Sequence, residues 1–372
     1  MRKLYSLLLV VMALMIPKGA WAALAVGDKF TVDGMTFKVT SIGPNEVQVG
    51  DNTPAIDMNT EGTVIIPSTV KDPDGGSYSV TSIGSSAFSK CKKMTEIQIP
   101  EGVTTISDAF FQCTSLVSVN IPSSVTYIGA AFNQCSALAE VHITDLKAWC
   151  GIEFMNNSTA NPLVIAQHLY LNGMEVKDLV IPEGTTKIGK FAFYKCNSLT
   201  SVTIPSGVTD FGERVFDSCE GLTSVTSASN LPSQTFRLCK NLKNVALLDG
   251  VTNIGERAFR QSGLTKISIP SSLKSVESYA FSECTSLTEV HIKDVASWCA
   301  IDFGFNLVSY DNNPLYYAHH LFLNGNEVKE LVIPEGVSAI NHRAFVGCEG
   351  LTSVKIPTTL TSIGESAFES CI

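Results

Sequence analysis

The stretch IGKFAFYKCNSLTSVTIP, residues Ile188–Pro205, contains the unit that decides the fold of this chain. An aromatic residue and a cysteine three positions later are followed by a short aliphatic strand of the pattern L-x-x-V-x-I-P. This unit occurs ten times in the chain, and each repeat is about 22 residues long. A period in this range is typical of a solenoid, because one unit cannot bury its own apolar face and must stack on its neighbours.

Two columns of residues mark the repeats. The aromatic column comprises Phe88, Phe110, Phe132, Phe193, Phe216, Phe236, Phe259, Phe281, Phe345 and Phe368. The column three positions later comprises Cys91, Cys113, Cys135, Cys196, Cys219, Cys239, Ser262, Cys284, Cys348 and Cys371. Eleven cysteines in a secreted chain would ordinarily suggest a disulfide framework. Because serine takes one place in the column, we interpret it instead as an interior ladder of free thiols acting as small hydrophobes.

Composition and charge exclude several classes of function. Of the 372 residues, 45% are hydrophobic and 16% are charged, so the chain has ample apolar material to bury. The net charge of −9 makes nucleic acid and anionic membrane surfaces unfavourable partners, since phosphate binding requires a basic stripe. The sequence has no C-x-x-C pair or Cys/His cluster of the kind that binds zinc, and we expect neither a metal site nor a cofactor.

The first 22 residues have the pattern of a secretory signal peptide. Arg2 and Lys3 precede an apolar stretch, and Ala20-Trp21-Ala22 is a small-x-small cleavage site. The apolar stretch is too short to span a bilayer, and no later segment is long and apolar enough to do so. We therefore expect cleavage after Ala22 and a protein that is secreted or displayed at the cell surface.

Residues 23–80 do not carry the repeat. They alternate apolar and polar residues on both sides of Asp33-Gly34, which predicts a β-hairpin. We expect this segment to form a small N-terminal β cap that covers the open edge of the first coil.

The solenoid is expected over residues 81–372, with two interruptions at 141–184 and 290–336 that are copies of one another. Trp149 and Trp298 lead these insert modules, either as plugs of a widened core or as edges of a surface bulge. The sequence stops at Ile372, before a further strand is written. We expect either that it is a fragment or that a partner covers this edge, with edge-to-edge association as one possibility.

At the run Ser82–Cys91 and its nine relatives, the chain resembles the BspA-type leucine-rich-repeat surface proteins of host-associated bacteria. The resemblance covers about 290 of the 372 residues. It implies a β-rich leucine-rich-repeat solenoid with short helical or 3-10 turns on its convex side. It also implies adhesion to host proteins or other cells, as described for some members. The family has no shared catalytic motif, so the resemblance implies no enzyme and supplies no catalytic residues.

The outward-facing positions of the strands are the candidate binding surface, since in leucine-rich repeats specificity usually resides on the concave sheet. Small hydroxyl side chains dominate there, which favours weak, multivalent contact with an extracellular protein or glycan. A merely solvated sheet face is the alternative. The candidate residues are Gln98, Asn120, Glu140, His142, Ser201, Thr203, Ser224, Thr226, Asn244, Ser268, Glu289, His291 and Lys355.

Catalytic interpretations of the same residues are weaker. Glu140 with His142 and Glu289 with His291 are two apart on a strand, so each pair shares a face and would suit acid–base or metal chemistry. No third ligand is evident for either pair. A structural stalk that displays a further domain beyond residue 372 and, more remotely, a polysaccharide-active enzyme remain the alternatives to a binding module.

Overall fold

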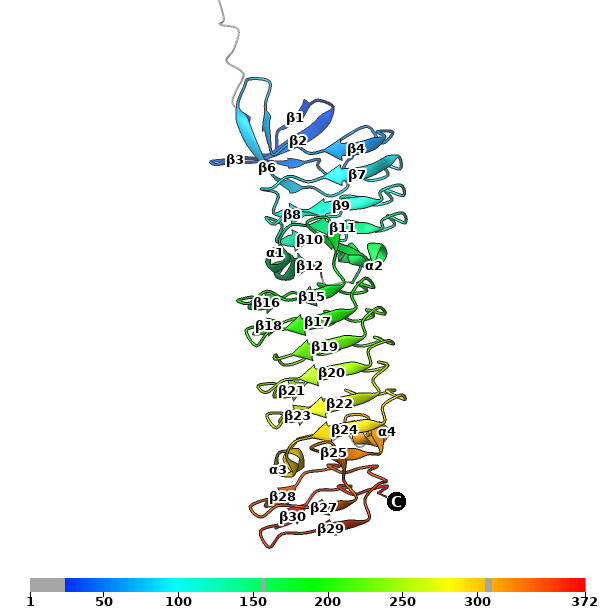
Figure 1. The fold of residues 1–372 in the computed structure, drawn as a ribbon. Coiled ribbons are helices and arrows are strands. Elements are labelled where there is room, and N and C mark those ends of the chain that lie inside the picture. The colour runs from blue at the N-terminus through cyan, green and yellow to red at the C-terminus, as the bar shows by residue number, and fades with distance from the viewer. Residues whose placement is uncertain (1–23, 156–157, 305–309, 372) are drawn as a thin grey trace, which may run out of the picture.

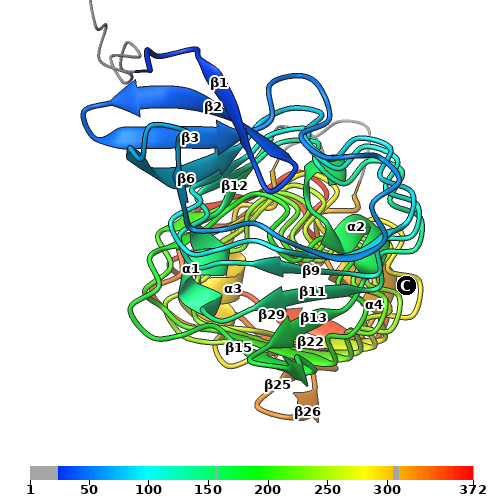
Figure 2. The ribbon, with the colours of Figure 1, turned by 90° about the horizontal axis from the view of Figure 1, so that it is seen from above.

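The computed structural model describes residues 24–155, 158–304 and 310–371, so the predicted signal peptide and its cleavage site lie outside the described residues. Figure 1 shows an elongated stack of coils with a group of hairpin strands at the N-terminal end. Seen along the stack in Figure 2, successive coils superimpose on a common outline. The predicted β-rich solenoid is confirmed.

The N-terminal strands form the predicted hairpin. Strands β1 (Lys29–Val32) and β2 (Met35–Ile42) pair antiparallel across the turn at Asp33 and Gly34, both with positive φ, and β3 (Asn45–Val49) follows. Strand β6 (Ser77–Ile83) pairs in parallel with β3 and antiparallel with β5 (Thr69–Lys71), and its far side pairs with the first coil. The hairpin therefore continues the hydrogen-bond ladder of the stack.

Each coil contributes one long strand to a parallel sheet. Strand β4 (Gly62–Ile65) pairs with β7 (Met94–Gln98), so this sheet extends into the segment that the sequence assigns to the cap. The sheet of β4 and β7 continues through β9 (Ser118–Ile121), β11 (Glu140–Ile143), β13 (Leu169–Leu171) and β14 (Met174–Glu175). An eight-stranded sheet follows, made of β15 (Asp178–Val180), β17 (Ser201–Ile204), β19 (Ser224–Ser227), β20 (Asn244–Leu247), β22 (Lys266–Ile269), β24 (Glu289–Ile292), β25 (Leu321–Leu323) and β26 (Asn326–Glu327). Strands β27 (Glu330–Val332) and β29 (Ser353–Lys355) form a separate pair.

Two-residue strands form a second side of the stack. They are β8 (Thr105–Ile106), β10 (Tyr127–Ile128), β12 (Glu153–Phe154), β16 (Lys187–Ile188), β18 (Asp210–Phe211), β21 (Asn253–Ile254), β23 (Ser275–Val276), β28 (Ala339–Ile340) and β30 (Ser362–Ile363). The helices of the described residues belong to the insert modules: α1 (Leu146–Gly151), α2 (Leu163–Ala166), α3 (Val295–Cys299), α4 (Leu315–Ala318) and a 3-10 turn at Ser158–Ala160.

The regular coils have hydrogen-bonded turns where they carry the Phe and Cys columns. In the first of them, Ser86 and Lys90 flank Phe88, and both have a φ of 63°. A left-handed residue ends a helix, so two of them four positions apart hold the segment to single turns.

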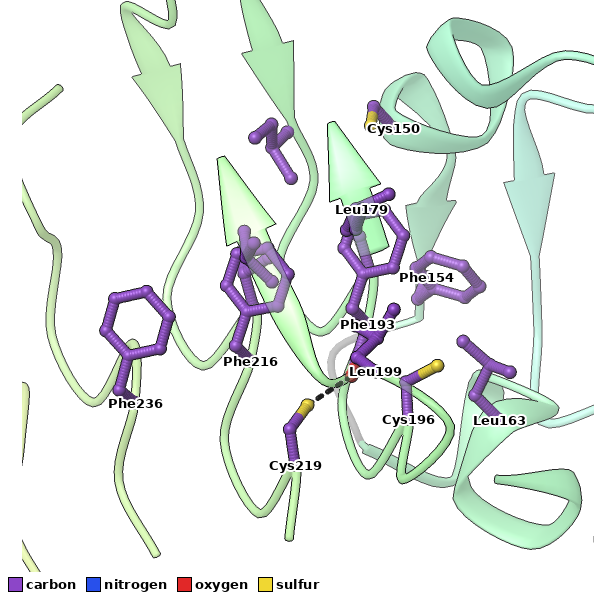
Figure 3. Packing of buried hydrophobic residues seen from close by; sticks show 14 of the residues in the cluster. Cys150, Phe154, Leu163, Leu179, Phe193, Cys196, Leu199, Phe216, Cys219 and Phe236 are labelled. Carbon is purple, nitrogen blue, oxygen red and sulfur yellow. Dashed lines mark hydrogen bonds between the residues drawn. The ribbon is translucent and has the colours of Figure 1, made fainter. Parts of the chain in front are cut away.

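The aromatic column is a stack of rings in the middle of the core. Phe216 lies between Phe193 and Phe236, with ring centroids 5.2 and 5.4 Å away and the planes within 8° of parallel. These three side chains are fully buried, and Figure 3 shows them in line along the stack. Phe368 is half-buried and stacks on one ring, Phe345, at 5.1 Å. The predicted interior column is confirmed.

The cysteine column is also interior, and its thiols make a specific hydrogen bond. The Cys219 thiol donates to the carbonyl oxygen of Phe193 in the preceding coil, with Sγ and O 3.1 Å apart (Figure 3). Cys113, Cys135, Cys239, Cys284 and Cys371 make the same bond at 2.9–3.1 Å. All eleven cysteines are free thiols, and all are buried except the half-buried Cys371. The slot thus holds a small side chain, which in six of the ten coils donates a hydrogen bond to the preceding coil.

Native-state alkylation should distinguish this buried ladder from an exposed one. Burial raises the pKa of Cys196 to about 12 and also raises the pKa of Cys219. We expect iodoacetamide at pH 8 to modify both residues about 100-fold more slowly in the native protein than in urea, because the thiolate is scarce and inaccessible. Peptide mass spectrometry measures both rates. Fast modification of native Cys219, or recovery of column cysteines as disulfides, would contradict the ladder.

One coil in the middle of the stack contains a buried ion pair. The Asp217 side chain is fully buried, and its Oδ2 accepts from both Nε and Nη2 of Arg237 in the next coil, each 2.9 Å away. Its Oδ1 accepts from the Ser218 hydroxyl at 2.8 Å. Both carboxylate oxygens are therefore satisfied without water.

The insert modules are tied to the following coil by side chains that replace a backbone donor. In a regular coil the amide N–H of the column phenylalanine donates to a carbonyl of the next coil, as Phe110 does to Ala131 at 2.8 Å. Where the first module replaces a coil, Trp149 Nε1 and Asn161 Nδ2 both donate to the Ala192 carbonyl, each at 3.0 Å.

The second module repeats this connection. Trp298 Nε1 donates to the Ala344 carbonyl at 2.8 Å, and Asn313 Nδ2 donates to it at 3.2 Å. Both tryptophan side chains are only 1% exposed. The tryptophans are therefore core plugs, and the alternative that they edge a surface bulge is wrong.

Candidate functional site

The side chains that point outward from the long strands form one surface, which we call the strand face. Its neighbouring residues come from successive coils, as in the register Thr203–Thr226–Ala246–Ser268–His291. Parallel strands lie about 4.8 Å apart, so these residues form a column along the stack. All thirteen candidate residues lie on this face at exposed or half-buried positions. The sheet breaks divide them into an N-terminal group, a central group and Lys355, which lies on the separate pair β27–β29.

In the N-terminal group, Gln98 and Asn120 are already hydrogen-bonded to neighbouring groups of the protein. Gln98 donates to Glu96 at 3.1 Å. Asn120 turns toward the strand beside it, where its oxygen accepts from the Ile99 N–H at 2.8 Å and its nitrogen donates to the Ile99 carbonyl at 2.7 Å. These groups have few hydrogen bonds left for a partner.

The two His–Glu pairs lie on the strand face, as the spacing predicts. Glu140 and His142 are 2.8 Å apart (Oε2 to Nε2), and the imidazole stacks on Tyr170 of β13 with ring centroids 4.8 Å apart. In the second module Glu289 and His291 are 2.7 Å apart, and His291 stacks on Phe322 of β25, also at 4.8 Å. The described residues include no group of three His, Cys, Asp or Glu side chains that would hold a metal ion.

The aromatic partners of these histidines were missed in the sequence. Tyr170 and Phe322 lie in the insert modules, two residues beyond His168 and His320, and the repeat pattern does not single them out. Counting two positions from each histidine would have placed both rings on the outward face. Their register opposite His142 and His291 depends on the path of the insert modules, which the sequence pattern does not fix.

The central group is the part of the strand face with uncommitted polar groups. Ser201 donates to Asp178 at 2.6 Å. Glu289 and His291 form the pair described above. For the remaining five residues of this group, the structure shows no side-chain hydrogen bond or ion pair within the residues it describes. These are Thr203, Ser224, Thr226, Asn244 and Ser268. A partner that lies across β17, β19, β20 and β22 therefore meets hydroxyls and an amide that are free to bond.

Short hairpins mark both ends of the central group. Strands β13 and β14 turn at Asn172-Gly173, and β25 and β26 turn at Asn324-Gly325, each turn having positive φ at both residues. Figure 2 shows the β25–β26 hairpin projecting beyond the outline of the stack on the side of the long strands. Beyond each hairpin the first strand of the next coil exposes a valine, Val180 or Val332.

The profile of the BspA-type leucine-rich repeat region matches the chain in six copies, over residues 76–161, 163–288 and 317–372. This chain belongs to the BspA-type leucine-rich-repeat family. No curated protein matches this chain. No helix among the described residues has the length and apolar character needed to cross a bilayer.

Among solved structures, this BspA-type protein is similar to a leucine-rich repeat protein from Bacteroides ovatus, with 27% identity over 92% of each chain and a TM-score of 0.57. A leucine-rich cell surface protein from Faecalibacterium prausnitzii is also 27% identical, over 92% of this chain and 73% of the other, with a TM-score of 0.38. The pneumococcal vaccine antigen PcpA is 18% identical over 93% and 90% of the two chains, with a TM-score of 0.41.

Proposed function

We propose that this protein is a secreted or surface-displayed, non-catalytic adhesion module whose central strand face binds an extracellular protein or glycan. Membership of the family indicates a protein-interaction or adhesion-type module. The single observation that carries the proposal is the central group itself, in which Thr203, Ser224, Thr226 and Asn244 present uncommitted donors and acceptors on a rigid sheet. The signal-like pattern of the first 22 residues supports the proposal that this surface lies outside the cell.

The chemistry of the face favours many weak contacts over one strong anchor. Hot spots of tight interfaces are enriched in Trp, Tyr and Arg, and the central columns contain none of these. Short hydroxyl side chains lose little conformational freedom when they form hydrogen bonds, and a repeated column offers the same contact in successive coils. Such a surface gains affinity by engaging an extended or repetitive partner.

Three substitutions to glutamate across the central face should test this function. Thr203→Glu, Ser224→Glu and Thr226→Glu together place bulky charges on adjacent strands. We expect binding to immobilised mucin or basement-membrane extract, measured by biolayer interferometry, to weaken about tenfold or more. The melting temperature should hold, because all three side chains point away from the core.

The matched control carries the same charge change on the short-strand side of the stack, in neighbouring coils. Thr186→Glu, Thr209→Glu and Thr252→Glu alter exposed residues that precede β16, β18 and β21. We expect this variant to bind like the unmodified protein. Equal loss in both variants would show that net charge, and not the strand face, controls binding. Unchanged binding in the central variant would place the site elsewhere.

A further inference from the structure

A cavity of about 450 Å³ opens on the strand face beside the β25–β26 hairpin. We call it the hairpin cavity and define it by Ala246, Asp249, Ser268, His291, Lys293 and the turn Asn324-Gly325. The aliphatic residues that line it are Leu247, Leu248, Ile269 and Ile292, of which Leu248 is exposed. Its volume lies in the range of about 300–1,000 Å³ that is usual for small-molecule sites.

Four polar side chains that line this cavity are uncommitted. Asp249, Ser268, Lys293 and Asn324 make no side-chain hydrogen bond or ion pair with the part of the chain that the structure describes. Asp249 and Lys293 are exposed and of opposite charge. His291 is fixed in orientation between Glu289 and the Phe322 ring. The cavity thus combines a held imidazole with donors and acceptors that have no internal partner.

The duplicated module provides an internal comparison, because the same backbone frame occurs beside the first hairpin. By strand register, Gln98 takes the place of Ala246 and Asn120 takes the place of Ser268. Gln98 is engaged with Glu96, and Asn120 is engaged with the Ile99 backbone. Larger side chains thus stand at these two positions, and each is hydrogen-bonded to a neighbouring group of the protein.

The carboxylate position differs in the same way. Glu101, three residues beyond Gln98 as Asp249 is beyond Ala246, accepts from the Ser123 N–H and hydroxyl and from the Ser124 N–H at 3.0–3.1 Å. These hydrogen bonds lower the pKa of Glu101 against the raising effect of burial, which is the largest single influence on it. Asp249 has no such partners. Beside the first module, Gln98, Asn120 and Glu101 are therefore hydrogen-bonded within the protein. Beside the second module, the smaller residues at the same positions leave a cavity and polar groups without a partner in the described part of the chain.

We propose that the hairpin cavity binds a neutral saccharide unit. This proposal rests on the proposed function, since it assigns one ligand class to part of the same face. One lysine and one aspartate give the cavity no net charge, which disfavours phosphate or a metal cation. A sugar ring offers hydroxyls that donate to Asp249 and accept from Lys293, Ser268 and Asn324. Its C–H face fits the aliphatic walls. The open side leaves room for the rest of a longer glycan.

Saturation-transfer NMR with free monosaccharides tests this assignment. The probes are galactose, mannose, fucose, N-acetylglucosamine and N-acetylgalactosamine at millimolar concentration. We expect at least one of them to receive saturation from the unmodified protein. The signal should fall about tenfold in Ala246→Gln/Ser268→Asn, which introduces the residues that the first module already carries at the equivalent positions. Asp249→Asn, an exposed and nearly isosteric change, should also weaken it.

The control is Thr186→Gln, which enlarges an exposed side chain that precedes β16 on the short-strand side of the stack and should leave the sugar signal unchanged. Absence of signal with all five sugars, or persistence of the signal in both cavity variants, would overturn the proposal. Binding to immobilised mucin or basement-membrane extract by the same samples separates the two proposals. If that binding survives while no sugar is bound, the strand face still functions and the saccharide assignment fails.

Discussion

Replacing Phe216 with alanine is expected to lower the free energy of unfolding by about 3–5 kcal/mol, the usual cost of removing a buried phenylalanine. The ring is fully buried and stacks on Phe193 and Phe236, so its loss opens a cavity between two neighbours. In a solenoid the stability is a sum over coils and their interfaces, and this change weakens two interfaces at once. Urea denaturation followed by far-ultraviolet circular dichroism measures the loss.

The same substitution at Phe368 should cost distinctly less. That ring is half-buried and stacks on Phe345 alone within the described residues. If Phe216→Ala and Phe368→Ala lower stability equally, the stacked-ring description of the core is wrong.

Replacing Arg237 with methionine should cost a similar amount at neutral pH, about 3–5 kcal/mol, because it leaves the Asp217 carboxylate buried without its counter-ion. Burial already raises the pKa of Asp217, opposed by the Ser218 hydroxyl and by the charges of Arg237 and Arg214. Removing Arg237 should raise this pKa further, so the folded variant binds a proton more tightly than the unfolded chain.

The sign of the pH dependence follows from that difference. A carboxyl whose folded pKa exceeds its unfolded value makes the protein more stable as the pH falls through the folded pKa. The deficit of Arg237→Met relative to the unmodified protein should therefore shrink between pH 7 and pH 5. In Asp217→Asn/Arg237→Met the titrating carboxyl is gone, so the gain in stability that Arg237→Met shows as the pH falls should be absent. A deficit in Arg237→Met that is constant over this range would contradict the buried ion pair.

The core was predictable from the sequence because a solenoid repeats its burial pattern. The columns at Phe193 and Cys196 recur in every regular coil, and the presence of Ser262 among the cysteines indicated a small, weakly polar slot. The hairpin at Asp33-Gly34 was likewise fixed by local turn chemistry. The thiol-to-carbonyl hydrogen bonds were not predictable, since they join residues of two coils in three dimensions.

The candidate site was predictable only as a face. Alternation along each strand placed Thr203 and Ser268 outward, but it did not indicate that Asn120 turns onto the Ile99 backbone while Ser268 has no partner. The hairpin cavity could not be predicted from the repeat pattern either, because it depends on where the turn Asn324-Gly325 lies beside the sheet. A polar side chain on this face can bind a partner only where no residue of an adjacent coil already forms a hydrogen bond with it.

Each insert module meets the next coil through the same two side chains, a tryptophan indole and an asparagine carboxamide. Since Trp149 and Asn161 present to Ala192 the donor that a regular coil would supply, the coil that follows needs no adjustment to the module before it. The junction at Trp298, Asn313 and Ala344 follows the same rule. We therefore expect that the number of modules in the array can change without any change in the core of the neighbouring coils.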